Sequence, residues 1–312
     1  MSELEKRFIG SMIGSALGDA IGELAFRTPH QAALQQQLEA AGELIYTDDT
    51  AMTIGLAQSI LAQQALDPQH LGDTFRENHR REPWRGYAAG PPALFRRVER
   101  EAIPYARAAQ EIYGGQGSFG NGAAMRIAPL GLYFHDAPDL YALARASATV
   151  THAHPIGIDG AAIQAQAVAR AIHLDPRQPL NSQAFVETLL DTARTAEMQD
   201  KLARIPDLLA EGATGGQAAR QLGQSVAVHE SLPFALYCFL RHPDSFEDCM
   251  RCAIFNGGDR DTLGAMACAV SGAYLGAGAI PVPWWDRLEN RARIEDLARR
   301  LAAASRDRDD GG

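Results

Sequence analysis

The stretch Gly10-Ser11-Met12-Ile13-Gly14-Ser15-Ala16-Leu17-Gly18-Asp19-Ala20-Ile21-Gly22 carries a glycine at every fourth position. Apolar residues run through it at spacings of mostly three or four, the pattern of a helix with an apolar face. Glycine inside a helix costs up to about 1 kcal/mol relative to alanine. Four glycines in register therefore predict that another helix approaches this one at backbone distance.

The rest of the chain also favours helices. Val occurs only eight times in 312 residues, and the alternating patterns typical of strands are scarce. We expect an all-α protein built as a single large orthogonal helical bundle over 1–304, with a disordered tail at 305–312. After the first helix, further helices are predicted at 50–65, 140–149, 160–172, 185–202, 216–227, 233–240, 245–254, 262–275 and 294–304.

An uncharged stretch between Thr262 and Trp285 is long enough to cross a bilayer. Its content is mostly Ala and Gly, which is weakly hydrophobic, and charged residues stand directly before it. We therefore expect a buried central helix and no membrane span.

Composition excludes several other classes. The formal net charge of -9 repels phosphate backbones on average, so a nucleic-acid binder is not expected. The four cysteines include one lone pair with CxxC spacing, Cys249 and Cys252, which favours reduced structural thiols over a zinc site. The beginning of the chain does not resemble a secretory leader. We expect a cytoplasmic protein, and a monomer.

Two acidic clusters each precede an apolar helix, Thr47-Asp48-Asp49-Thr50 and Asp259-Arg260-Asp261-Thr262. Helix capping alone explains each cluster, because Thr and Asp are favoured at helix N-termini. If both helix starts face one cleft, however, the four carboxylates repel one another, which raises their pKa values or requires a cation. Carboxylate and hydroxyl oxygens without His or Cys suit Mg²⁺ or Mn²⁺. Four Asp and two Thr exceed the needs of one octahedral ion, so the cleft of the bundle is predicted to be metal-binding, with two ions.

Glycines and prolines interrupt the helical pattern repeatedly between 81 and 131, which is typical of a binding loop. Within it, Gly117-Ser118-Phe119-Gly120-Asn121 offers backbone N–H groups to phosphate and an aromatic ring to a sugar or base. A plain turn is the alternative. Farther on, His152 is interpreted as a ligand contact, and His154 as a structural or surface residue.

These motifs together resemble the ADP-ribosylglycohydrolase family, which includes the dinitrogenase reductase-activating glycohydrolase and the ADP-ribosyl-acceptor hydrolases. The resemblance covers roughly 8–285 and rests on Gly14-Ser15-Ala16-Leu17-Gly18-Asp19-Ala20, Tyr46-Thr47-Asp48-Asp49-Thr50, Gly120-Asn121-Gly122-Ala123-Ala124-Met125-Arg126, Thr151-His152-Ala153 and Gly257-Gly258-Asp259-Arg260-Asp261-Thr262. The segments 117–122 and 230–241 look most like the serine-specific branch.

The resemblance implies a ligand set for two Mg²⁺ ions, with Mn²⁺ as the alternative: Thr47, Asp48, Asp49, Asp259, Asp261 and Thr262. It also implies that ADP-ribose lies along Gly117, Ser118, Phe119, Gly120 and Asn121, with Gly90, Tyr113 and His152 nearby. Asp49 and Asp261 are expected to bridge the ions or orient the attacking water.

Three positions depart from the family pattern. An acidic residue commonly lies on a mobile flap about seven positions after the Gly-Asp pair, where this chain has Phe26; either Glu23 takes over as the catalytic acid or that acid is missing. Ala88 stands where a glycine is expected. Arg260 stands where a small residue is usual, and it either pairs with a carboxylate, reaches a substrate phosphate or points away.

We therefore expect a Mg²⁺-dependent hydrolase that removes ADP-ribose from a modified protein or small molecule by cleaving the bond at the anomeric ribose carbon. Serine-linked ADP-ribose is the first substrate hypothesis. Arginine-linked ADP-ribose, O-acetyl-ADP-ribose and poly(ADP-ribose) are alternatives, as is a non-catalytic ADP-ribose binder or crystallin-like protein.

Overall fold

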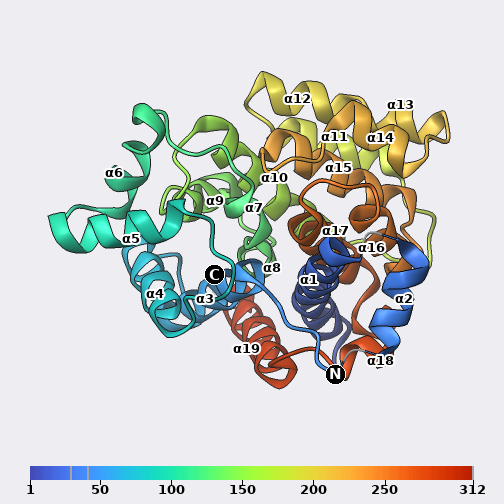
Figure 1. The fold of residues 1–312 in the computed structure, drawn as a ribbon, viewed down its shortest axis with the longest axis horizontal. Helices are drawn as coiled ribbons and strands as arrows, with labels where there is room; N and C mark the ends of the chain where they lie inside the picture. Colours follow the sequence, from blue (N-terminus) through green and yellow to red (C-terminus); the bar gives the residue numbers. More distant parts are fainter. Residues whose placement is uncertain (29, 41, 311–312) are drawn as a thin grey trace.

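The computed structural model describes residues 1–28, 30–40 and 42–310. The helices are α1 (Glu3–Arg27), α2 (Gln31–Ala40), α3 (Asp48–Gln63), α4 (Pro68–Arg81), α5 (Gly90–Glu101), α6 (Tyr105–Gln110), η1 (Tyr113–Gly115), α7 (Gly122–Met125), α8 (Ala128–Tyr133), α9 (Leu140–Ala148), α10 (Pro155–Ala171), α11 (Ser182–Thr192), α12 (Ala196–Ala203), α13 (Ile205–Ala210), α14 (Gly215–Leu222), α15 (Val228–Arg241), α16 (Phe246–Ile254), α17 (Arg260–Leu275), η2 (Ala277–Ala279), α18 (Val282–Trp285) and α19 (Arg291–Asp310). Figure 1 shows their arrangement.

The prediction of an all-α protein is confirmed. Within the described ranges, β-type pairing is limited to two isolated bridges, Leu44 with Leu288 and Gly120 with Ala227. Helices cross one another at steep angles in Figure 1, as expected for a bundle that is not a coiled coil.

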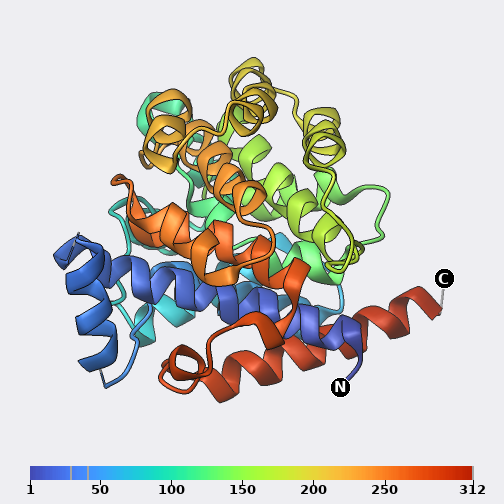
Figure 2. The ribbon, with the colours of Figure 1, turned by 90° about the vertical axis from the view of Figure 1, so that its right-hand side faces the viewer.

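The central pair of the bundle is α1 and α17, which run side by side through the middle of the molecule (Figure 2). The pair is antiparallel, because Gly10 faces Gly272 whereas Gly18 faces Gly264. A Cβ placed on Gly10 would lie 2.4 Å from the carbonyl oxygen of Gly272, closer than real Cβ atoms come to backbone. The prediction of a backbone-distance approach is confirmed, and its partner is the uncharged helix.

The helix α17 is the buried central helix that the sequence predicts. Every residue from Thr262 to Tyr274 is buried. None of the described helices combines the length and the apolarity needed to cross a bilayer.

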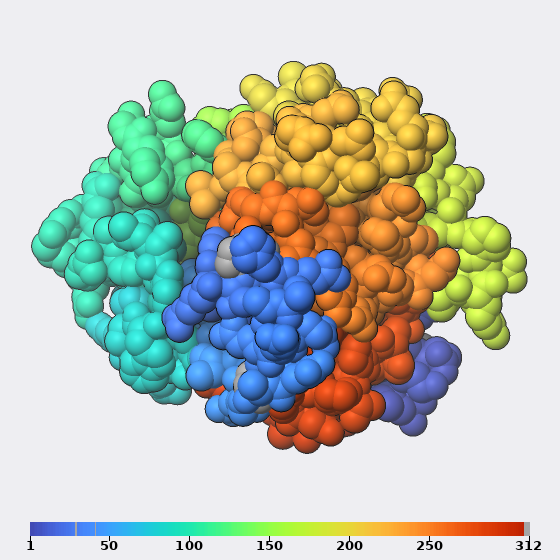
Figure 3. All heavy atoms as spheres, turned by 45° about the vertical axis from the view of Figure 1, so that its right-hand side comes forward, coloured from blue at the N-terminus to red at the C-terminus, as the bar shows by residue number. Residues whose placement is uncertain are grey.

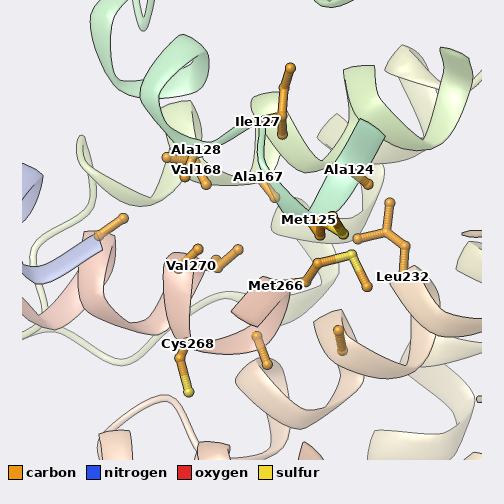
Figure 4. Close-up of a cluster of buried hydrophobic side chains, with 14 of the residues drawn as sticks. Ala124, Met125, Ile127, Ala128, Ala167, Val168, Leu232, Met266, Cys268 and Val270 are labelled. Atoms are coloured by element: carbon orange, nitrogen blue, oxygen red, sulfur yellow. The ribbon is translucent and has the colours of Figure 1, made fainter. Parts of the chain in front are cut away.

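A continuous apolar core surrounds this pair. Its largest cluster of buried side chains extends along the sequence from Phe8 to Ala302. Figure 4 shows Met125 of α7, Leu232 of α15 and Met266 of α17 pointing toward one another in this core. Asn121, just before α7, and the start of α17 belong to the site described below. The packing of these core side chains therefore holds the two elements that carry the site.

Part of the tail predicted as disordered, 305–310, is described by the structure and is helical there. The helix α19 continues to Asp310, Ser305 is fully buried, and its hydroxyl donates to the carbonyl of Tyr133 at 3.1 Å. Ile294, Ala298, Leu301 and Ser305 are buried at alternating spacings of four and three. The small Ser305 therefore continues the buried face of the helix. The sequence interpretation had taken this polar residue as the start of a tail.

The helix predicted at 185–202 is also interrupted. It divides into α11 and α12 because the buried carboxylate of Asp159 accepts hydrogen bonds from the backbone N–H groups of Arg194 and Thr195 and from the Thr195 hydroxyl. A carboxylate from α10 thus replaces the helical bonds that these groups would otherwise make.

The punctuated stretch 81–131 folds into the short helices α5 to α8, joined by loops. On another face, the α2 segment lies over the part of the chain that carries α16 (Figure 3), where Arg251 donates to the Gln35 side chain at 2.8 Å.

Candidate active site

The start of α3 is fixed by a buried aspartate on α1. Asp19 is fully buried, and its carboxylate accepts the backbone N–H and the hydroxyl of Thr47 as well as the backbone N–H and the hydroxyl of Thr50. The shortest of these distances is 2.6 Å, from the Thr50 hydroxyl. Burial raises the pKa of Asp19 to about 6, although the hydrogen bonds from both threonines oppose the shift. Thr47 therefore turns its hydroxyl toward Asp19.

The start of α17 reaches the same place through a glycine turn. Gly258 has a φ of +69°, and a Cβ there would lie 2.0 Å from the carbonyl oxygen of Gln224. Only glycine fits this approach. The backbone N–H of Asp259 then donates to the same Gln224 carbonyl, and the Asp259 carboxylate accepts the side-chain amide of Asn121 at 2.7 Å.

The structure brings the two acidic clusters together on one cavity. Asp48, Asp49, Asp259, Asp261 and Thr262 all line a cavity of about 280 Å³. Burial and neighbouring carboxylates raise the pKa of Asp48 to about 7 and that of Asp261 to about 8. The pKa of the buried Asp49 is raised as well, first by burial and then by Asp19 and Asp261. The electrostatic conflict predicted for converging helix starts is therefore present.

The donor set fits hard divalent cations. The Thr262 hydroxyl lies 3.5 Å from Oδ2 of Asp49, and within the described ranges Oδ1 of Asp49 is buried and has no hydrogen-bond partner. A buried carboxylate oxygen without a donor is costly unless a cation or water satisfies it. Oxygen ligands alone, on the starts of two helices, suit Mg²⁺ or Mn²⁺ better than zinc.

The aspartates are spaced more widely than ligands crowded around one ion. Across the described ranges, the one group of three His, Cys, Asp or Glu ligand atoms that all lie within 4.8 Å of one another is elsewhere in the protein. The presence of two ions stays a prediction.

The predicted ADP-ribose residues divide between this cavity and an adjoining hollow. Gly90, Tyr113, Ser118, Gly120, Asn121 and His152 line the cavity with the aspartates. Gly117 and Phe119 line a neighbouring hollow of about 240 Å³, which shares Tyr113, Ser118 and Gly120 with the first. The Phe119 ring is 43% exposed and stands edge-on to the His154 ring, 5.2 Å between centroids. The two hollows therefore adjoin, with the aspartates lining the first and Phe119 lining the second.

The buried His152 faces this cavity as a neutral imidazole. Burial, and secondly the charge of Arg126, lowers its pKa to about 3. Its Nδ1 lies 2.7 Å from the hydroxyl of Thr151, and a Cβ on Gly122 would come within 2.9 Å of its ring. His152 can therefore hydrogen-bond a ligand but does not carry a charge near neutral pH. His154, in contrast, caps α10 by accepting the backbone N–H of Ile156 at 3.2 Å.

One residue that the sequence interpretation left without a role is Arg126. It is fully buried, stacks on the Phe75 ring, and donates to the carbonyls of Gly122 and Ser147. Burial lowers its pKa to about 9, and Asp48 is the acid that favours its charged form. Its positive charge therefore acts on Asp48. The sequence feature that could have pointed to Arg126 is its position in the segment 120–126, one of the motifs that resemble the family.

Two other predicted residues, Thr47 and Glu23, do not line the cavity that the aspartates share. They line another hollow together with Arg27 and Trp84. This hollow shares Gly86 with the aspartate cavity, and Glu23 pairs with Arg27 at 3.5 Å. Glu23 is therefore not brought into the aspartate cavity. Phe26 is 45% exposed.

The remaining departures have simple structural outcomes. Arg260 donates to the carbonyl of Ile254 at 2.7 Å, at the end of α16, so it points away from the carboxylates. Ala88 lines the cavity alongside Gly90, where a Cβ on Gly90 would lie 3.6 Å from the Tyr113 hydroxyl.

Comparisons with known proteins identify the family. The profile of the ADP-ribosylglycohydrolase family matches residues 1–311. The chain belongs to the ADP-ribosylglycohydrolase family. It is 34% identical over 296 residues to the ADP-ribosylhydrolase ARH3 of Homo sapiens, covering 84% of this chain and 80% of that protein. It is 33% identical over 306 residues to the ADP-ribosylhydrolase ARH3 of Danio rerio, covering 87% of this chain and 81% of that protein.

A solved structure of an ADP-ribosylglycohydrolase-related protein complex superimposes with a TM-score of 0.73 and 27% identity, covering 98% of this chain and all of that chain. The resemblance inferred from the motifs is therefore confirmed for the family, the fold and the class of activity, hydrolysis of a glycosyl bond of ADP-ribose. The comparisons favour the enzyme over the non-catalytic binder.

Proposed function

We propose that this ADP-ribosylglycohydrolase depends on two Mg²⁺ ions, replaceable by Mn²⁺, and removes ADP-ribose from modified serine side chains. The observation that carries the proposal is the convergence of Asp48, Asp49, Asp259 and Asp261 on one cavity beside the glycine-rich segment. The similarity to ARH3 supports the serine-linked substrate. A cytoplasmic location, a monomeric state and the lack of nucleic-acid binding stay predictions.

The residues that would hold the ions are Asp48, Asp49, Asp259, Asp261 and Thr262, with Thr47 at the edge of the group. When bound, such ions anchor ribose hydroxyls and activate a water molecule. The protein keeps the ligands in place through Asp19, which holds the start of α3, and through Asn121, which holds Asp259.

The ADP-ribose would lie across the two adjoining hollows. The segment 117–121 would border the diphosphate, although the backbone N–H groups of Gly117, Gly120 and Asn121 already donate within the protein. The Phe119 ring offers a stacking surface. His152, as a neutral imidazole held through its Nδ1 contact with Thr151, hydrogen-bonds the ribose. This placement brings the anomeric carbon to the acidic end.

At the acidic end, the carboxylate of Asp49 or Asp261 accepts a proton from the attacking water as the bond from the anomeric carbon to the acceptor breaks. The leaving serine oxygen takes up the proton that the carboxyl group accepted, so that one water is consumed and free ADP-ribose and unmodified serine are formed.

Four substrates separate the proposed specificity from its alternatives. Peptides carrying serine-linked or arginine-linked ADP-ribose, O-acetyl-ADP-ribose and poly(ADP-ribose) are incubated with the enzyme and Mg²⁺, or with EDTA. We expect fastest release of ADP-ribose from the serine-linked peptide, only with the metal. Faster release from another substrate would overturn the serine assignment, and full release in EDTA would overturn the metal assignment.

The ligands are tested by the double variant Asp259→Asn/Asp261→Asn. It should lose most activity, at least about a hundredfold, and keep its helical circular dichroism, because the aspartates lie at a cavity and not in the apolar core. Asp296→Asn, an exposed acid on α19 with 64% side-chain exposure, is the matched control and should stay fully active. Full activity of the double variant would contradict the proposal.

A further inference from the structure

A second group of potential metal ligands lies outside the aspartate cavity. Nδ1 of His135 is 2.9 Å from Oδ2 of Asp136 and 3.2 Å from Nε2 of His173, and the same His173 nitrogen is 3.2 Å from Oδ1 of Asp136. His135 and Asp136 follow α8, whereas His173 follows α10, so two chain segments meet here. These three side chains are called the His-Asp cluster below.

Hydrogen bonding alone satisfies this geometry poorly. Each ring nitrogen needs a proton to donate to the Asp136 carboxylate, but the two protonated nitrogens would then face each other at 3.2 Å. If either nitrogen gives up its proton, it instead presents a lone pair to the carboxylate. A cation between the three groups removes the conflict, because both nitrogens and the carboxylate then act as ligands.

The distances match a tetrahedral metal site. Zinc binds histidine nitrogen at about 2.0–2.1 Å and carboxylate oxygen at about 2.0–2.2 Å, which places two ligand atoms of a tetrahedron about 3.3–3.4 Å apart. The separations in the cluster are 2.9, 3.2 and 3.2 Å. An outward movement of a few tenths of an ångström by the exposed side chains is enough to accept the ion.

The surroundings hold one ligand firmly and leave the others accessible. The His135 side chain is only 5% exposed, and its ring stands edge-on to Phe8 of α1, 6.3 Å between centroids. The Asp136 and His173 side chains are 55% and 40% exposed. An ion can therefore enter from solvent against a fixed imidazole.

The cluster is separate from the aspartate cavity. His135 contacts α1 at Phe8, whereas the active site contacts the same helix at Asp19, eleven residues or about 16 Å farther along the axis. Two imidazoles and a carboxylate suit Zn²⁺, Co²⁺ or Ni²⁺, and not the hard Mg²⁺ of an oxygen-only site.

We propose that His135, Asp136 and His173 form a second metal site, which binds one transition-metal ion such as Zn²⁺ and joins the segment after α8 to the end of α10. Arg7 already ties this end of α10 to α1 by donating to the carbonyls of Ile172 and Leu174. The ion adds a cross-link between segments 38 residues apart. Its role is structural, so the hydrolase activity does not require it.

Cobalt binding to the full-length enzyme tests the site, with excess Mg²⁺ present to fill the aspartate cavity. Four-coordinate Co²⁺ absorbs visible light far more strongly than octahedral Co²⁺, so the spectrum reports the geometry. We expect one four-coordinate Co²⁺ per chain, displaced by Zn²⁺. His173→Ala and Asp136→Asn should each weaken binding by more than about 100-fold, because loss of a residue behind a ligand already costs about 10- to 100-fold.

Two controls make the outcome specific. Asp139→Asn, an exposed acid three residues after Asp136 that makes no side-chain cap to α9, should bind Co²⁺ like the wild type. Asp259→Asn/Asp261→Asn should also keep the spectrum, which places the ion outside the active site. Hydrolase activity should be unchanged in His173→Ala. Wild-type protein without a four-coordinate spectrum, or His173→Ala with the wild-type spectrum, would overturn the site.

Discussion

Gly18 on α1 and Gly264 on α17 lie in backbone contact, so that a Cβ on Gly18 would stand 2.1 Å from the carbonyl oxygen of Gly264. This contact connects the fold to the site, because Asp19 and Asp261 lie one and three residues away from the two glycines. Helices without side chains between them bring the two acidic clusters within reach of one cavity.

Replacement of Gly18 by alanine should destabilise the protein by about 3 kcal/mol or more, because the new methyl group meets backbone that cannot move aside. Urea unfolding measures the change. Gly278→Ala is the control, since a Cβ there meets nothing within 4 Å. Equal stability of the two variants would mean that α1 and α17 are not packed as described.

Magnesium should stabilise the protein more strongly at pH 8 than at pH 5.5. The pKa values of Asp48 and Asp261, about 7 and about 8, lie above their ordinary value of 3.8. The folded state therefore binds more protons than the unfolded state between about pH 4 and 8, and the metal-free free energy of unfolding falls as pH rises through this window. Bound cations replace those protons.

Thermal unfolding with Mg²⁺ or EDTA across this pH range measures the effect. The metal-free melting temperature should fall toward pH 8, while the gain from Mg²⁺ grows. A gain that is the same at pH 5.5 and pH 8 would show that the ion does not bind at these carboxylates.

Much of the arrangement was predictable from the sequence. The glycines at 10, 14, 18 and 22 predicted the close helix pair. Glycine destabilises a helix interior, and four glycines on one face are explained by a second helix that packs against their backbone. The acid clusters at 47–50 and 259–262 were visible because each stands at the start of an apolar helix.

Other features depend on contacts that no local pattern reveals. Asp19 binds Thr47 and Thr50, which lie 28 and 31 residues along the chain. Asp159 breaks a helical pattern around Thr195 from 36 residues away. The helix α19 runs past the end predicted at 304, because Ser305 is polar but small enough to be buried against α8.

Phe119→Ala should raise KM for the ADP-ribosylated substrate about tenfold and change kcat less. Stacking of a base or sugar on an aromatic ring is worth about 1–3 kcal/mol, and Phe119 lies away from the acidic end of the site. Steady-state kinetics on the serine-linked peptide provide the measurement. A loss confined to kcat would place the ring at the reacting centre instead.

Glu23→Gln should change turnover by less than about threefold, because Glu23 pairs with Arg27 and lines a hollow apart from the aspartates. The comparison is kcat on the same peptide, with Glu43→Gln, another acid of that hollow, as control. If only Glu23→Gln loses a hundredfold or more, Glu23 moves into the aspartate cavity during the reaction and serves as the acid that Phe26 cannot supply.

Anomalous diffraction from crystals grown with Mn²⁺ and ADP-ribose tests the central claim most directly. The account predicts two manganese peaks among Asp49, Asp259 and Asp261, with the ribose beside them and the rest of the ligand along 117–121. Crystals in which ADP-ribose fills the site with no manganese among these aspartates would contradict it.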